Sequence, residues 1–100
     1  MSDDIAIEHA ASRDRYELRD DGEVIGVLQY RLPDDGHVDL VHTEVDKEHG
    51  GRGLATKLVA FAVDDIVRSG RRIIPHCPYV VSWLERHHDA DEHIDWPDRS

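Results

Sequence analysis

The sequence has few of the residues on which several classes of protein depend. Lysine and arginine together number 12, against 22 aspartates and glutamates, and the formal net charge is −10. Proteins that bind a nucleic-acid backbone draw their affinity from basic side chains that displace counterions, so we expect no nucleic-acid partner. The single cysteine, Cys77, cannot form an internal disulfide. It is either a packing residue, a reactive thiol or an intermolecular crosslink.

Long hydrophobic runs are also missing. Apolar stretches such as residues 24–28 are far shorter than the about 18 to 20 residues that a bilayer-spanning helix requires. Residues 1–4 lack the basic and apolar regions of a secretory signal. We therefore expect a cytoplasmic protein without a membrane segment. Because 100 residues support one hydrophobic core and not two, we expect a single domain, 1–100, that is a monomer or a weak dimer.

The acidic residues are spread along the chain, and 15 of the 22 are aspartate. One explanation is adaptation to high salt, in which a strongly charged surface keeps the protein soluble and screening relieves its self-repulsion. The other is an acidic patch that attracts a cationic substrate. Aspartate occurs in nearly every predicted turn, as its turn-forming chemistry allows. We therefore favour the first explanation and expect a halophilic protein whose folding needs salt.

Four segments in the first half alternate apolar and polar residues, as strands do. We predict strands over 4–9, 14–19, 23–32 and 37–45. The sequence Asp20-Asp21-Gly22 is a hairpin signal between the second and third strands. The sequence Pro33-Asp34-Asp35-Gly36 predicts a turn between the third and fourth. Short connections of this kind predict an antiparallel four-stranded meander.

The second half of the chain changes to a helical period. Apolar rows spaced three and four residues apart predict an amphipathic helix over 52–69, which Gly70 ends. A short apolar strand over 72–77 follows, and Pro78 begins a second helix. A strand, a helix and a strand in succession form a right-handed crossover, so the fifth strand is predicted to lie parallel to the fourth. The fold class is therefore α+β (α/β).

Three glycines, Gly50, Gly51 and Gly53, lie between the fourth strand and the first helix. Glycine lets the backbone approach a ligand closely, and the first-turn N–H groups and the helix dipole favour an anion. The loop therefore predicts a phosphate site that uses main-chain N–H groups and Arg52. A Walker loop is excluded because its Gly-Lys-Ser/Thr sequence is absent. The alternative is a flexible connection that binds nothing.

Together these motifs resemble one known family. The segments His-Thr-Glu-Val (42–45), Gly-Arg-Gly-Leu-Ala (51–55) and Ile-Pro-His-Cys-Pro-Tyr-Val (74–80) are similar to those of the Gcn5-related N-acetyltransferase superfamily. The resemblance covers about residues 5–88 and is to the small, stand-alone, YidJ-like domains. It implies acetyl-CoA as cosubstrate, an amine as acceptor and no metal.

The resemblance also implies where coenzyme A binds. The backbone of Thr43, Glu44 and Val45 would pair with the pantetheine arm where the fourth and fifth strands splay apart, a splay usually aided by a bulge. The loop would bind the pyrophosphate through Gly50, Gly51, Arg52, Gly53, Leu54 and Ala55. Gly50 stands where the family usually has Gln or Arg. The helices that larger members insert after the first strand are missing, as is the closing strand pair, which implies an open, shallow acceptor site.

Three residues are candidates for catalysis. Cys77, at the end of the fifth strand, would lie at the thioester; it either protonates the leaving thiolate or accepts the acetyl group itself. Tyr79, in the first turn of the last helix, is a second candidate proton donor. His42, expected to share a strand face with Leu40 and Glu44, could take a proton from the acceptor amine, or be a buried structural histidine. His76 is a weaker candidate, because alternation points it away from Cys77.

The function predicted from these residues is transfer of an acetyl group from acetyl-CoA to a primary amine. A small amine, a polyamine and a protein amine are equally compatible as acceptors. The alternatives are a non-enzymatic module that holds coenzyme A or an acyl-CoA for a partner protein, and an interaction domain without a cofactor. The tail, 88–100, is expected to be loosely packed, with Ile94 and Trp96 as possible anchors. Its histidines and carboxylates match no zinc template.

Overall fold

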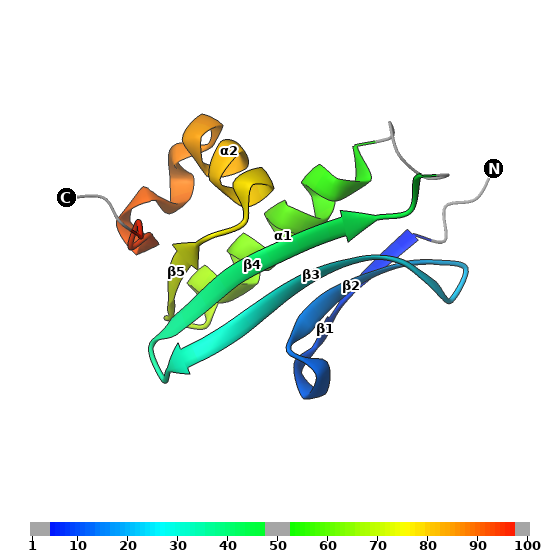
Figure 1. Cartoon of the computed structure of the whole chain (residues 1–100), viewed down its shortest axis with the longest axis horizontal. Helices are drawn as coiled ribbons and strands as arrows, with labels where there is room; N and C mark the ends of the chain where they lie inside the picture. Colours follow the sequence, from blue (N-terminus) through cyan, green and yellow to red (C-terminus); the bar gives the residue numbers. More distant parts are fainter. Residues whose placement is uncertain (1–4, 48–52, 98–100) are drawn as a thin grey trace.

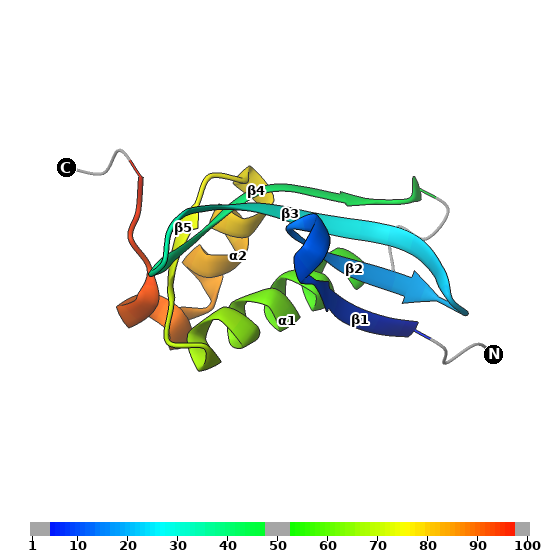
Figure 2. The same cartoon turned by 90° about the horizontal axis from the view of Figure 1, so that it is seen from below.

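The protein is a five-stranded sheet with two helices on one of its faces (Figures 1 and 2). The computed structural model describes residues 5–47 and 53–97. The strands are β1 (Ile5–Ala10), β2 (Arg15–Asp20), β3 (Glu23–Asp34), β4 (His37–Val45) and β5 (Arg72–Pro75), and the helices are α1 (Leu54–Arg68) and α2 (Pro78–Arg86). Short 3-10 helices cover Ala11–Arg13 and His88–His93.

The strand order in the sheet is β1-β2-β3-β4-β5. The first four strands pair antiparallel with their neighbours, and β5 pairs parallel to β4 after the crossover through α1. This confirms the predicted meander, the parallel fifth strand and the α+β class. The face covered by the helices carries the core, whose largest buried side chains include Tyr16, Leu18, Leu28, Leu40, Leu58, Ile66, Ile73 and Leu84.

The turns follow the predicted chemistry with one shift. Asp21 and Gly22 both have positive φ, 54° and 85°, and form the two-residue turn between β2 and β3. Strand β3 runs two residues beyond the predicted end, through Pro33 to Asp34. The register is irregular between Arg31 and Asp34, and at such a point the missing N–H of a proline costs no ladder bond. The carboxylate of Asp34 then closes the turn by accepting a hydrogen bond from the main-chain N–H of Gly36, at 2.8 Å.

Helix α1 begins at Leu54, two residues later than predicted. Gly53 precedes it with φ +70°, a left-handed conformation that cannot continue the helix. The predicted stop is confirmed, because Gly70 has φ +82° directly after the last turn. Helix α2 has its predicted start at Pro78 and ends at Arg86. The elements that flank the predicted loop and the Cys-Pro-Tyr segment are therefore in place.

The sheet face opposite the helices is polar and ion-paired. Glu17 is buried at the centre of its strand and faces away from the helices, since its neighbours in the chain, Tyr16 and Leu18, fill the core. Its carboxylate accepts bonds from Arg15 at 2.8 Å and Arg19 at 2.8 Å. A buried carboxylate needs such partners, and the arginines supply them to Glu17 on a face that the helices do not cover. We call it the open face of the sheet.

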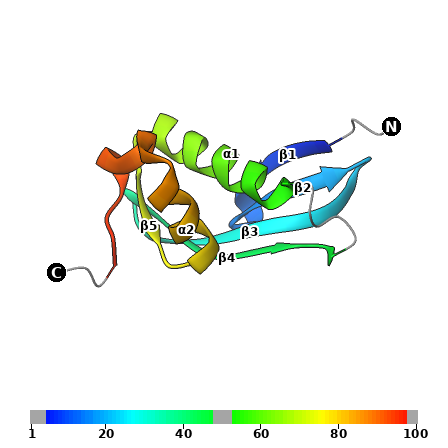
Figure 3. The ribbon, with the colours of Figure 1, turned by 90° about the horizontal axis from the view of Figure 1, so that it is seen from above.

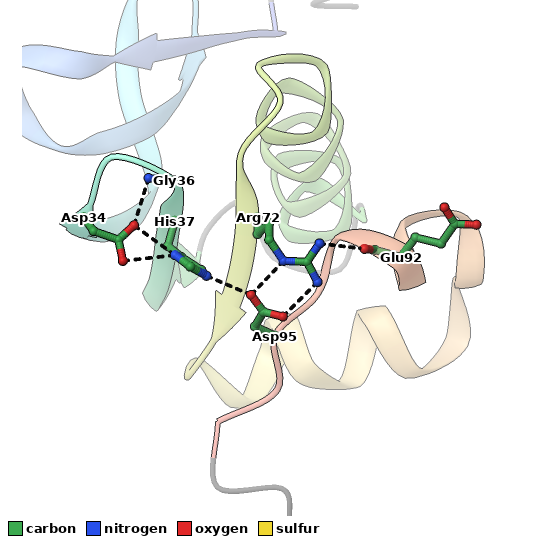
Figure 4. Close-up of polar contacts among 6 residues, drawn as sticks. All are labelled: Asp34, Gly36, His37, Arg72, Glu92 and Asp95. Carbon is green, nitrogen blue, oxygen red and sulfur yellow. Dashed lines mark hydrogen bonds and ion pairs between the residues drawn. The ribbon is translucent and has the colours of Figure 1, made fainter.

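The expectation of a loosely packed tail is wrong for residues 88–97, and residues 98–100 lie outside the described part of the chain. Ile94 is buried and bridges Ile73 of β5. The carboxylate of Asp95 accepts two bonds from Arg72, at 2.7 and 2.8 Å, and its Oδ2 lies 2.8 Å from a ring nitrogen of His37 (Figure 4). These partners come from strands far away in the sequence, so local composition does not predict them.

Candidate active site

The most distinctive feature of the sheet is an opening between β4 and β5. The two strands pair only from His37 to Leu40 on β4. At the end of this ladder the carbonyl of Leu40 accepts bonds from two successive N–H groups, those of His76 at 3.0 Å and Cys77 at 2.9 Å. Beyond Leu40, β4 continues to Val45 while β5 has ended (Figure 1). The predicted splay of the two strands is therefore present.

A bulge in β4 decides which side chains face this opening. Gln29 of β3 pairs with His42, but the next residue of β3 pairs with Leu40, so Val41 is an extra residue in β4. An extra residue reverses the alternation of side chains beyond it. Thr43 and Val45 therefore lie on the helix face with Leu40. His42 lies on the open face, which corrects the expectation that it shares a face with Leu40.

The thiol of Cys77 lies inside the opening on the helix face. Its Sγ is 3.3 Å from Oγ1 of Thr43, and the residue is 4% exposed. The prediction that Cys77 ends the fifth strand is wrong, because β5 ends at Pro75. Cys77 is instead the residue directly before α2, in an extended conformation. The thiol is thus held between the end of a strand and the start of a helix.

The first turns of both helices meet beside the opening. Thr56 Oγ1, in the first turn of α1, lies 2.9 Å from the hydroxyl of Tyr79, in the first turn of α2. Figure 3 shows the two helices side by side on this face of the sheet. Among the described residues, no side-chain hydrogen bond caps the start of either helix. Uncapped first-turn N–H groups and two helix dipoles directed at one place favour an anion there.

The predicted phosphate loop is only partly within the described residues. Gly50, Gly51 and Arg52 lie outside them. Gly53 is exposed, and a Cβ placed on it would meet nothing within 4 Å. The side chain of Leu54 is buried in the core, so this residue offers a ligand only its backbone. The side chain of Ala55 is half-buried. Main-chain groups, and not side chains, are therefore what this part of the loop presents.

Two imidazoles lie on the open face near the opening. His42 Nε2 is 3.3 Å from Glu44 Oε1, and both side chains are exposed. His76 Nδ1 is 2.6 Å from Oδ1 of Asp39, whose carboxylate is buried and also accepts a bond from Arg31 at 3.2 Å. Asp39 is not among the site residues predicted from the sequence. Its position as a charged residue within the otherwise apolar segment 38–41 is the signal that could have identified it.

Two negative findings apply to residues 5–47 and 53–97. No helix there is both long and apolar enough to cross a bilayer. No group of three or more histidine, cysteine, aspartate or glutamate side chains is arranged there to hold a metal ion.

Comparisons with known proteins find a matching family model and similar sequences. A family model described as GCN5-related N-acetyl-transferase matches residues 15–93. The protein NATD1 of Bos taurus is 33% identical over 82 residues, which cover 81% of this chain and 73% of that protein. NATD1 of Xenopus tropicalis is 32% identical over 85 residues, with 84% and 78% covered.

Two solved structures share the fold. A GCN5-like protein from Staphylococcus aureus has a TM-score of 0.72 at 21% identity, and the match covers 94% of this chain and 91% of the other. A ribosomal-protein-alanine N-acetyltransferase from Brucella melitensis biovar Abortus 2308 has a TM-score of 0.61 at 22% identity, with 86% and 66% covered.

Proposed function

Because the chain belongs to the GCN5-related N-acetyltransferase family, we propose that it transfers an acetyl group from acetyl-CoA to a primary amine. The observation that carries the proposal is the opening between β4 and β5, with the thiol of Cys77 and the hydroxyl of Thr43 inside it and two uncapped helix starts beside it. This arrangement offers a slot for an extended arm and an anion site next to it.

The residues present fit coenzyme A. From Thr43 to Val45, the edge of β4 that faces β5 is not paired with that strand. The main-chain groups on this edge are therefore available to pair with the amides of the pantetheine arm. The N–H groups after Gly53 suit the pyrophosphate, and Gly50, Gly51 and Arg52 complete the loop in this proposal. The overall charge of −10 repels the polyanionic cosubstrate. Binding therefore depends on these local main-chain groups and on Arg52.

The proposed reaction is direct transfer. The nitrogen of the neutral amine attacks the carbonyl carbon of the thioester, the C–S bond breaks, and the thiolate of coenzyme A leaves with a proton. We assign the donation of that proton to Cys77, because its thiol lies inside the opening, 3.3 Å from Oγ1 of Thr43. Tyr79 is the second candidate donor, with its hydroxyl held by Thr56. His42 remains a predicted acceptor of the proton from the amine.

A covalent route through an acetylated Cys77 is less well supported. A thiol nucleophile is activated by a neighbouring base that takes its proton. Within the described residues the polar contact of the Cys77 thiol is a neutral hydroxyl, that of Thr43. The imidazole of His76, although adjacent in sequence, is bonded to Asp39 on the other face of the sheet.

The experiment measures turnover and binding on the same sample. Release of free coenzyme A is followed with a thiol reagent while small amines, polyamines and peptide amines are offered with acetyl-CoA, and binding is followed as the rise in melting temperature that a ligand of the native state causes. The proposal expects both signals. A thermal shift without thiol release would favour a non-enzymatic binding module, and no thermal shift would favour an interaction domain without a cofactor.

A further inference from the structure

A histidine on the open face is held in place by a buried carboxylate at the point where β4 and β5 separate. His76 Nδ1 lies 2.6 Å from Oδ1 of Asp39, and the Asp39 side chain is 8% exposed. The main-chain N–H of His76 donates to the carbonyl of Leu40, the last residue of β4 that pairs with β5. The imidazole therefore stands at the apex of the opening, on the face that the helices do not cover.

The partner of Nδ1 fixes what the other ring nitrogen can do. An ionised carboxylate only accepts hydrogen bonds, so in the neutral imidazole Nδ1 carries the proton and Nε2 keeps its lone pair. The other carboxylate oxygen of Asp39, Oδ2, lies 3.2 Å from a guanidinium nitrogen of Arg31. The side chain of His76 is 45% exposed, so its free nitrogen is accessible to a molecule arriving on the open face.

We propose that His76 is the general base that takes a proton from the acceptor ammonium, and that Asp39 is the residue that positions it. This inference rests on the proposed function. The helix face of the opening, which Thr43 and Cys77 line, is the part assigned to acetyl-CoA. The acceptor must then approach the thioester from the open face, where His76 stands at the same end of the opening.

The acceptor ammonium gives one proton to Nε2 of His76 and becomes a neutral amine, whose lone pair forms the new C–N bond. The C–S bond breaks and its electron pair leaves with the sulfur. As the amide forms, the nitrogen loses its second proton, which passes through water to the thiolate that Cys77 becomes on giving its own proton to the leaving sulfur. The imidazolium of His76 releases its proton to water.

His42 is the other imidazole on this face, and the geometry favours it less. Its side chain is 55% exposed, and the carboxylate of Glu44 that lies 3.3 Å away is 75% exposed. Exposed partners of this kind hold a side chain weakly. A base must be oriented toward the proton that it abstracts, and of the two imidazoles His76 is the one with a buried carboxylate partner.

The test uses the full chain and variants at both positions of the pair. With a responsive amine, His76→Gln should lower kcat by about 100-fold or more, in the range for loss of a general base, with an unchanged KM for acetyl-CoA. Asp39→Asn should lower kcat by a smaller factor. Added imidazole should raise the rate of His76→Ala. The matched control, His88→Gln, removes an exposed histidine of the C-terminal segment and should keep the rate of the unchanged protein.

A spectroscopic measurement tests the pair without relying on activity or on a folded variant. Nitrogen NMR of ¹⁵N-histidine in the unchanged protein should find the neutral His76 ring protonated at Nδ1 and bare at Nε2. A proton on Nε2 would overturn the assignment. An undiminished kcat in a folded His76→Gln would do the same, as would failure of imidazole to act on His76→Ala. If the unchanged protein acetylates no amine, the proposed function fails and this inference fails with it; if it does and only the His76 results are negative, only this inference fails.

Discussion

The thiol of Cys77 lies 3.3 Å from the hydroxyl of Thr43, across the opening where β4 and β5 cease to pair. The bulge at Val41 turns Thr43 toward the helix side, and Cys77, in an extended conformation directly before Pro78, lies at the same place. Two residues 34 positions apart thus define the point at which the acetyl group is expected to react.

Variants of Cys77 and mass spectrometry together separate the two chemical routes. In direct transfer, Cys77→Ala should lower kcat by about 100-fold, since a proton donor typically contributes roughly 100- to 10,000-fold. Cys77→Ser keeps an O–H group and should retain more of the rate. Tyr79→Phe should have a smaller effect than Cys77→Ala. Intact-protein mass spectrometry after incubation with acetyl-CoA alone should find no acetyl adduct, and a stable adduct on Cys77 would establish the covalent route instead.

Gly53 offers a test of the phosphate site with an internal control. At φ +70°, Gly53→Ala places a Cβ in open space but in a left-handed conformation, which costs about 1 to 2 kcal/mol. Gly22, with φ +85° and equally open surroundings, lies in the β2–β3 turn. Gly22→Ala should therefore cost similar stability in urea unfolding. Only Gly53→Ala should weaken binding of coenzyme A by calorimetry; equal affinities for the two variants would contradict the site.

The pH dependence of stability should report on His37. Hydrogen bonds to Asp34, the larger effect, and to Asp95 raise the pKa of His37. The contribution of this histidine to folding stability is therefore complete below about pH 6.5, the usual pKa of histidine, and is lost as pH rises through the raised pKa. Hydrogen bonds from Arg72 and then His37 lower the pKa of Asp95. That contribution is present above the usual carboxyl pKa of about 3.9 and is lost as pH falls.

The measurement compares melting temperatures of the unchanged protein and His37→Gln across this range. The difference between them should be largest at mildly acidic pH and should shrink as the solution becomes alkaline. His88→Gln, whose imidazole pairs with an exposed carboxylate three residues away, serves as the control. A difference that stays constant with pH would contradict the role of the ion-paired cluster around Asp95.

The net charge of −10 predicts dependence on salt. Acidic side chains repel one another in dilute buffer, and added ions screen that repulsion within about 10 Å at 0.1 M. The circular dichroism signal of the fold should therefore increase with potassium chloride. A full native signal in dilute buffer would refute the interpretation of the acidity as an adaptation to salt.

Local chemistry predicted the elements of this fold well, and contacts between distant residues decided the rest. Asp21-Gly22 and Gly70 mark element ends through their own backbone preferences, so the sequence alone locates them. The bulge at Val41 depends on how β4 pairs with β3, and simple alternation therefore put His42 on the wrong face. The bond between Asp39 and His76 spans 37 positions and leaves no periodic signal.

The most direct test of the central claim is an amide chemical-shift map of the ¹⁵N-labelled protein titrated with acetyl-CoA. The account predicts the largest shifts in three segments that meet at the opening: residues 43–45 of β4, 53–56 at the start of α1, and 77–79 before and in the first turn of α2. Shifts confined to other regions, such as the groove between α1 and α2 that Trp83 and Ala90 line, would contradict it, as would a spectrum that does not change.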